Sequence, residues 1–189
     1  PRMGIGTITE VLALSCGIEN IRPNAEVTKV FHNDERICRI QINEDEKVET
    51  DLVVSTVPLG IFVQIMEPKP PKRILSLSRS LRYRSVVLVA LFLENESVTR
   101  AASVYFPHPD FVFTRIHEPR NRSVCMSPSG KTSLVAEIPC QAGDEIYDLD
   151  DDRLAQMVRS KLVEIGWIEN EEITDCLLYT SPSPRDRTR

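Results

Sequence analysis

The chain has 189 residues, the length of one ordinary domain, and its 41% hydrophobic and 27% charged residues are typical of soluble globular proteins. The formal net charge of −5 argues against a dedicated nucleic-acid surface, and no apolar run approaches the roughly 20 residues that span a bilayer. The five cysteines are widely spaced without a zinc-ligand pattern, so we expect no metal site and a reducing, cytoplasmic compartment.

The first predicted elements are a helix and a hairpin. Residues 7–13 place apolar side chains on one helical face, and the helix should stop near Gly17. Residues 21–32 resemble a strand, Asn33-Asp34 marks a turn, and residues 37–42 alternate apolar and polar side chains. The pattern therefore predicts two strands joined by a tight connection.

Residues 51–56, DLVVST, differ from these strands because their apolar residues are continuous. Such a run is typical of a strand buried on both faces, as in a parallel sheet. A helix is expected over residues 59–66.

The rest of the chain alternates strand and helix patterns, with the strongest strand signal at residues 86–93. Further helices are predicted at residues 74–81 and 150–165, and further strands at residues 103–106, 113–117 and 132–137. This order indicates a mixed α/β or α+β architecture.

The end of the chain has a different character. Residues 176–186, CLLYTSPSPRD, show no helix or strand period and resemble, residue for residue, one reading frame of a transposase sequencing adapter. We therefore expect residues 176–189 to be a non-native tail. Because Pro1 is not an initiator, the native gene is expected to extend in both directions.

Three groups of segments together resemble the flavin-containing amine oxidase superfamily, in its protoporphyrinogen-oxidase-like branch. The segments are PRMGIGTITEVL at 1–12; NAEVTKV at 24–30 with ETDLVVSTVPL at 49–59; and LRYRSVVLVALFL at 81–93 with FTRIHEPRNRS at 113–123 and KTSLVAEIPC at 131–140. The resemblance implies the middle part of a two-domain FAD-binding fold: an α/β Rossmann-like domain with an α+β substrate domain. It assigns residues 1–66 to a partial FAD-binding domain, which lacks the G-x-G-x-x-G half, and residues 67–175 to the substrate-binding portion.

The same resemblance implies FAD as the cofactor and places four residues near it. The backbone of Val27 would read the adenine edge, although a plain core valine is the alternative. Ser55, Thr56 and Pro58 end the expected buried strand, where ligands of open α/β sheets bind, although an ordinary strand-to-helix turn would look the same.

A polar cluster at Arg115, His117 and Glu118 is the candidate substrate site. On a strand, Arg115 and His117 would share one face, and arginine binds carboxylates with two parallel hydrogen bonds. The alternative is a structural Arg–Glu pair at a sheet edge.

The strand at residues 86–93 has no lysine, whereas amine oxidases of this superfamily carry one there that holds a water near the flavin. The departure favours the protoporphyrinogen-oxidase-like branch, in which the flavin is the redox agent, and no catalytic side chain is assigned.

The leading interpretation is an FAD-dependent oxidase or dehydrogenase acting on a small organic molecule. The alternatives are a flavin-dependent mutase of the UDP-galactopyranose mutase type and a non-enzymatic α+β binding module. No nucleic-acid partner is expected, and no membrane association is visible in the sequence.

Overall fold

The computed structural model describes residue 4 and residues 6–33, 35–141 and 143–181. The chain divides into two compact units, one formed by Ala13–Arg82 and the other by the residues from Tyr83 onward with those before Ala13. The expected boundary after residue 66 falls inside the unit Ala13–Arg82. The other boundary between the two units, at residues 12 and 13, falls inside helix α1 (Gly6–Cys16).

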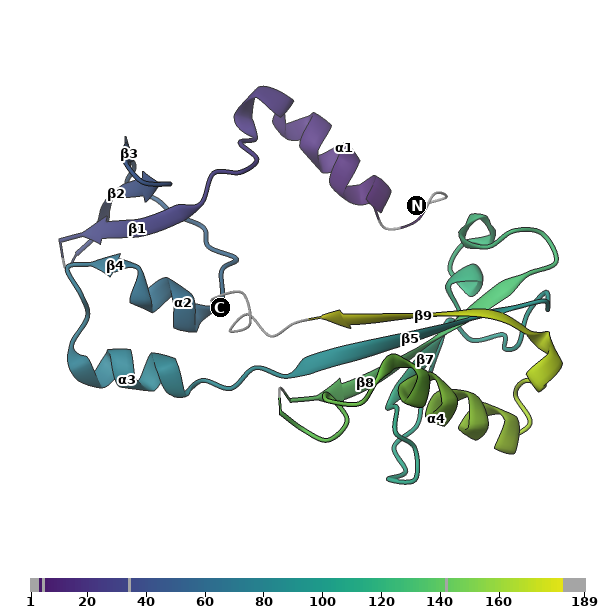
Figure 1. Ribbon diagram of the computed structural model, residues 1–189. Helices are drawn as coiled ribbons and strands as arrows, with labels where there is room; N and C mark the ends of the chain where they lie inside the picture. Colours follow the sequence, from purple (N-terminus) through teal and green to yellow (C-terminus); the bar gives the residue numbers. More distant parts are fainter. Residues whose placement is uncertain (1–3, 5, 34, 142, 182–189) are drawn as a thin grey trace. The chain divides into compact units, whose positions relative to one another are not determined.

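The unit Ala13–Arg82 contains a four-stranded sheet with the order β3-β2-β1-β4 (Figure 1). Its strands are β1 (Val27–His32), β2 (Ile37–Ile42), β3 (Glu46–Glu49) and β4 (Met66–Glu67), and its helical segments are η1 (Ile18–Asn20), α2 (Leu59–Gln64) and α3 (Lys72–Ser80). The predicted hairpin of β1 and β2 is confirmed as an antiparallel pair. The first strand begins at Val27 and not at residue 21, because Asn24 adopts a positive φ of 58° that interrupts an extended strand. Asp34, predicted in the turn, lies outside the described residues.

The expectation of a buried strand at residues 51–56 is wrong. This segment forms no strand, and its side chains are open to solvent, with Leu52 74% and Val54 87% exposed. A continuous apolar run becomes a buried strand only where neighbouring strands satisfy its backbone groups. No strand of the described residues pairs with this segment.

The other unit contains an antiparallel five-stranded sheet with the order β6-β7-β8-β5-β9 (Figure 1). The strands are β5 (Ser85–Leu93), β6 (Ser103–Tyr105), β7 (Arg115–His117), β8 (Thr132–Cys140) and β9 (Ile173–Ser181). The short helical segments η2 (Pro119–Asn121), η3 (Val124–Met126) and η4 (Asn170–Glu172) lie in the connections. The central pair, β5 with β8, runs in register over nine residues from Ser85↔Cys140 to Leu93↔Thr132.

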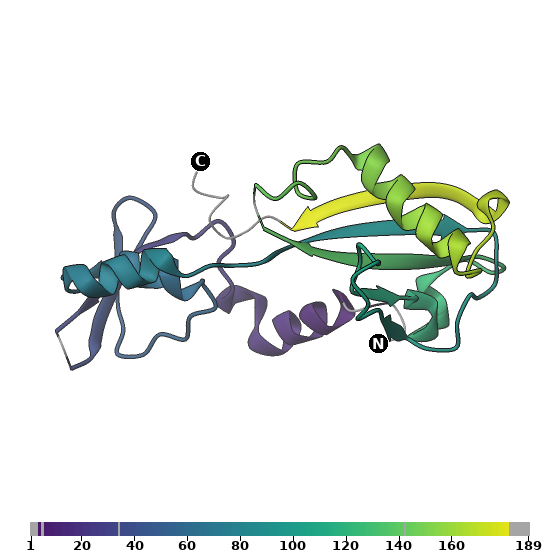
Figure 2. The same cartoon turned by 90° about the horizontal axis from the view of Figure 1, so that it is seen from below.

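Helix α4 (Asp151–Glu164) lies across one face of this sheet and encloses the core with it (Figure 2). The helix is predicted correctly because its signals are local: Asp150 accepts a hydrogen bond from the Arg153 N–H at 2.8 Å, and apolar residues recur at helical spacing. Leu154, Val158 and Leu162 are buried against alternate residues of β5 and β8.

The last described strand contradicts the expectation that the end of the chain lacks a strand pattern. Residues 173–181 form β9, which pairs antiparallel with β5 from Leu93↔Ile173 to Val86↔Ser181. Cys176 and Leu178 pack against the core. The edge of β5 offers unpaired N–H and C=O groups to any extended segment, so pairing there does not require a particular sequence. Residues 182–189 lie outside the described residues, and the non-native origin of this tail stays a prediction.

Candidate functional site

The face of the five-stranded sheet opposite α4 gathers the polar residues that the sequence indicates on β7. One cross-strand row runs from β6 to β9 through Tyr105, Arg115, Glu137, Leu88 and Tyr179. The next row contains Ser103, His117, Val135, Ala90 and Leu177. Directly paired residues project to the same side of a sheet. The expectation that Arg115 and His117 share a face is therefore confirmed, and Glu137 lies beside both.

Arg115 is held by two polar partners on this face. Its Nη2 donates to Glu137 Oε1 at 2.5 Å, and its Nη1 donates to Tyr105 Oη at 3.3 Å. The hydrogen bond with Glu137 is the largest influence that raises the pKa of Arg115, followed by the one with Tyr105, so the guanidinium stays charged. The Nε of Arg115 is buried without a hydrogen-bond partner among the described residues. The guanidinium thus still has a donor that the described residues leave unused.

His117 shares the carboxylate of Glu137 with Arg115, at 3.5 Å between Nδ1 and Oε1. Burial lowers the pKa of His117; Glu137 opposes this, and the nearby charges of Arg122 and Arg115 add to it. The ring is therefore neutral at neutral pH and presents one donor and one acceptor nitrogen.

A cavity of about 370 Å³ lies over this cluster. Its polar lining residues are Arg115, His117, Arg122, Ser123 and Glu137, and its apolar side chains are Ile8, Pro119 and Met126. Gly4 also lines the cavity; its φ is 92°, and a Cβ built there would lie 2.8 Å from Met126 Sδ. Glycine suits this position because it adopts positive φ without a steric cost. The cavity is therefore lined by both charged and apolar side chains.

Glu118, which the sequence grouped with Arg115 and His117, lies apart from them in a buried position. It is fully buried, and its carboxylate accepts four hydrogen bonds: from Val98 N at 3.0 Å, Thr99 N at 2.9 Å, Asn121 Nδ2 at 3.0 Å and Thr132 Oγ1 at 2.7 Å. These contacts connect the 98–99 loop, η2 and β8. The structure thus gives Glu118 a supporting role beneath the cavity wall and no contact with the cavity.

The four residues expected at a cofactor lie in the other unit, on two separate segments. Val27 begins β1, and β4 pairs only with Val30 and Phe31, so within the described residues the other edge of β1 has no strand partner at Val27. An unpaired strand edge suits a residue that binds through its backbone. The backbone of Val27 is therefore available on this edge for the adenine contact that the sequence predicts, and the contact itself stays a prediction.

Ser55, Thr56 and Pro58 form the turn into α2. Ser55 Oγ accepts a hydrogen bond from the Val57 N–H at 3.2 Å, Thr56 is exposed, and Pro58 precedes the first residue of the helix. This local turn is the alternative that the sequence left open, and its exposed position leaves it accessible to a ligand.

Sequence reasoning missed two charged residues of the cavity, Glu137 and Arg122. Glu137 occupies an outward position among apolar residues of β8, which is a visible signal, but its partner Arg115 is fixed only by the register of β7 against β8. Arg122 follows η2 and donates to Ser103 Oγ at 3.0 Å. No ion pair of Arg122 occurs in the described part of the chain.

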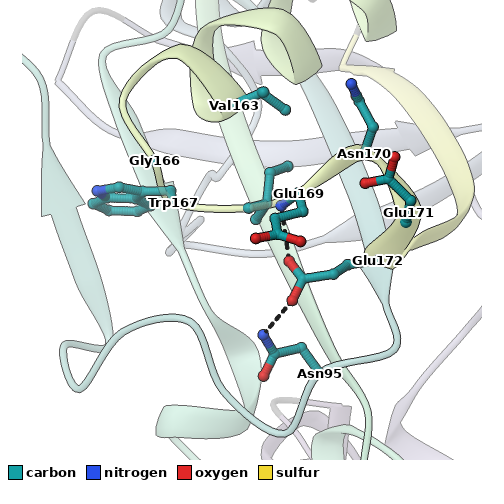
Figure 3. A pocket seen from close by; sticks show the side chains of 9 residues that line it. Asn95, Val163, Gly166, Trp167, Glu169, Asn170, Glu171 and Glu172 are labelled. Atoms are coloured by element: carbon teal, nitrogen blue, oxygen red, sulfur yellow. Dashed lines mark hydrogen bonds between the residues drawn. The ribbon is translucent and has the colours of Figure 1, made fainter.

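A second hollow, of about 530 Å³, lies beside the end of α4 and is acidic (Figure 3). Its central carboxylate, Glu172, accepts from Glu169 N at 2.9 Å and from Asn95 Nδ2 at 3.0 Å, so it caps η4 and connects it to the loop after β5. Across the residues that the structure describes, no group of three or more His, Cys, Asp or Glu is placed to hold a metal ion. None of the described helices has the length and apolar character needed to cross a bilayer.

Solved structures share the fold of this chain. A reduced UDP-galactopyranose mutase matches with a TM-score of 0.78 and 17% identity over 95% of this chain and 40% of its own. A putrescine oxidase bound to putrescine matches with a TM-score of 0.67 and 18% identity over 95% of this chain and 38% of its own. A protein from Exiguobacterium sp. assigned as a protoporphyrinogen oxidase gives 0.68 and 18% over 95% of this chain and 39% of its own.

This chain therefore spans about two fifths of the length of these structures. No curated protein sequence matches it significantly. The sequence profile of the family described as flavin containing amine oxidoreductase matches residues 1–178, nearly the whole chain. The chain belongs to the flavin-containing amine oxidoreductase family.

Proposed function

We propose that this chain is part of an FAD-dependent oxidoreductase that removes a hydride from a small organic substrate. The observation that carries the proposal is the family match over residues 1–178. Residues 1–66 would contribute to the FAD-binding part, with Val27, Ser55, Thr56 and Pro58 near the cofactor. Residues 67–175 would supply the substrate-binding part, and residues 176–189 a non-native tail. FAD, when bound, takes up the hydride equivalent that the substrate loses.

The open face of the five-stranded sheet supports the substrate-binding role. Arg115 and His117 present charged and neutral polar groups on this face, and the apolar residues Leu88 and Ala90 lie in the same cross-strand rows beyond β8. These side chains bind and orient the substrate and exclude water from its apolar part. Glu118 contributes indirectly, because it fixes the segments that form the cavity wall.

The same face favours a substrate other than a simple amine. The residues of β5 that alternate with the buried ones are Val86, Leu88, Ala90 and Phe92, and none of them is the lysine of amine oxidases. This composition supports the protoporphyrinogen-oxidase type of activity within the family.

The test is a flavin assay on the full-length reading frame. We expect the purified protein to carry flavin absorbance, which bleaches anaerobically with a cyclic or apolar C–H donor and not with putrescine. A full-length protein that folds without flavin would overturn the cofactor assignment, and rapid bleaching by putrescine would overturn the substrate preference.

A flavin-dependent sugar-nucleotide mutase is the second candidate. The observation that favours it is the presence of two arginines, Arg115 and Arg122, in one cavity. A guanidinium can bind two oxygens of a phosphate group through two parallel hydrogen bonds. A mutase isomerises its substrate without net oxidation, so conversion of UDP-galactopyranose with unchanged flavin oxidation state would identify it.

A further inference from the structure

The cavity over β7 and β8 has an unbalanced charge. Arg115 is neutralised by Glu137, and burial lowers the pKa of His117, so that the imidazole is neutral at neutral pH. Arg122 donates only to the hydroxyl of Ser103 and forms no ion pair within the described ranges. One positive charge therefore remains without a carboxylate partner in a hollow of about 370 Å³.

Part of the cavity lining is apolar. Met126 and Pro119 come from η3 and η2, and Ile8 comes from α1, all within the same compact unit as the arginines. A lining that combines apolar side chains with one guanidinium lacking an ion-pair partner suits a ligand with a hydrocarbon body and one anionic group.

From this arrangement we propose that the cavity binds a monoanionic organic carboxylate, with Arg122 as the principal ligand of the carboxylate and the Met126–Pro119 wall against its apolar body. Carboxylate is favoured over pyrophosphate because a pyrophosphate brings at least two negative charges to a cavity with one uncompensated positive charge and with the carboxylate of Glu137 in its lining. The identification of this anion as part of the substrate rests on the proposed function.

The experiment uses the 189-residue chain without flavin and two probes, benzoate and inorganic pyrophosphate, at constant ionic strength. Binding is followed by the NMR shifts of the arginine Nε–H groups and of the His117 ring. We expect benzoate to shift Arg122 and His117 saturably, with pyrophosphate binding more weakly. Arg122→Gln should weaken benzoate binding about tenfold or more, because a charge-assisted hydrogen bond is lost.

The matched control is Arg153→Gln, which removes the same charge from the exposed side of α4, on the other face of the sheet. This variant should bind benzoate as the parent chain does. Circular dichroism of both variants establishes that they fold, which is expected because both arginines are exposed.

Absence of saturable benzoate shifts, equal weakening by both variants, or tighter binding of pyrophosphate than of benzoate would each overturn the proposal. The readout needs no flavin and no turnover. A failure here is therefore separate from a failure of the flavin assay on the full-length protein, which tests the oxidoreductase assignment itself.

Discussion

Glu118→Gln tests whether the buried carboxylate beneath the cavity is a structural hub. In the parent chain, Oε1 accepts from Val98 N and Thr132 Oγ1, and Oε2 accepts from Thr99 N and Asn121 Nδ2. Glutamine keeps the shape of the side chain but turns one of the two acceptor oxygens into a donor. Its least disruptive orientation places the NH₂ at the Oε1 position, because the Thr132 hydroxyl can rotate to accept.

The expected loss of stability in Glu118→Gln depends on which buried donor loses its hydrogen-bond partner. In that orientation the Val98 N–H faces a donor inside a fully buried site, at a cost of about 1–3 kcal/mol. Thr132→Val is the matched variant: it removes one donor and leaves the carboxylate with three hydrogen bonds, so it should cost about 1 kcal/mol. Glu118→Ala leaves all four donors without their acceptor and should lower stability more than either of these variants.

The assay combines urea denaturation with amide hydrogen exchange, because exchange reports on individual residues in a chain with two compact units. We expect faster exchange at Val98 and Thr99 in Glu118→Gln, and unchanged exchange in the hairpin of β1 and β2. A Glu118→Gln chain within 0.5 kcal/mol of the parent, with protected Val98 and Thr99 amides, would refute the role assigned to this carboxylate.

Three further outcomes are expected. Deleting residues 176–189 should lower the melting temperature by several degrees and promote aggregation, because it uncovers the edge of β5 along Val86–Leu91; equal melts would show that the strand contributes nothing. Burial lowers the pKa of His117 below its ordinary value of 6.5, so its contribution to stability is present above pH 6.5 and is lost as the pH falls below it; His117→Gln should flatten melting temperatures between pH 5 and pH 8 relative to the parent. In the full-length protein, Val27→Ala should keep its FAD affinity while a folded Val27→Pro loses about tenfold to a hundredfold by fluorescence titration; equal affinities would make Val27 a core valine only.

Elements with local signals were predictable from the sequence. The hairpin strand Ile37–Ile42, the apolar strand at β5 and the amphipathic helix α4 each carry their own pattern, and α4 also has an N-cap. The segment at residues 51–56 was mispredicted, because whether an apolar run is buried depends on strands elsewhere in the chain. Local pattern therefore determines element type better than it determines burial.

The candidate site was predictable only in part, for the same reason. Arg115 and His117 were grouped correctly, since two residues of one strand separated by one position must share a face. Glu137 joins them through a register that no local pattern fixes, 22 residues away from Arg115. Glu118 looked like a third member because it is adjacent in sequence, yet its carboxylate is buried and binds the 98–99 loop and Thr132, which are distant in sequence, as well as the nearby Asn121.

The alternation of β5 has a consequence for how this protein can change over evolution. Val87, Val89 and Leu91 face the core under α4, whereas Leu88, Ala90 and Phe92 face the open side. Substitutions in the first set disturb the packing of the core. Substitutions in the second set change the surface of the open face at little cost to the stability of the fold. One strand thus carries two independent sets of positions, so the composition of the open face can change while the packing under α4 stays the same.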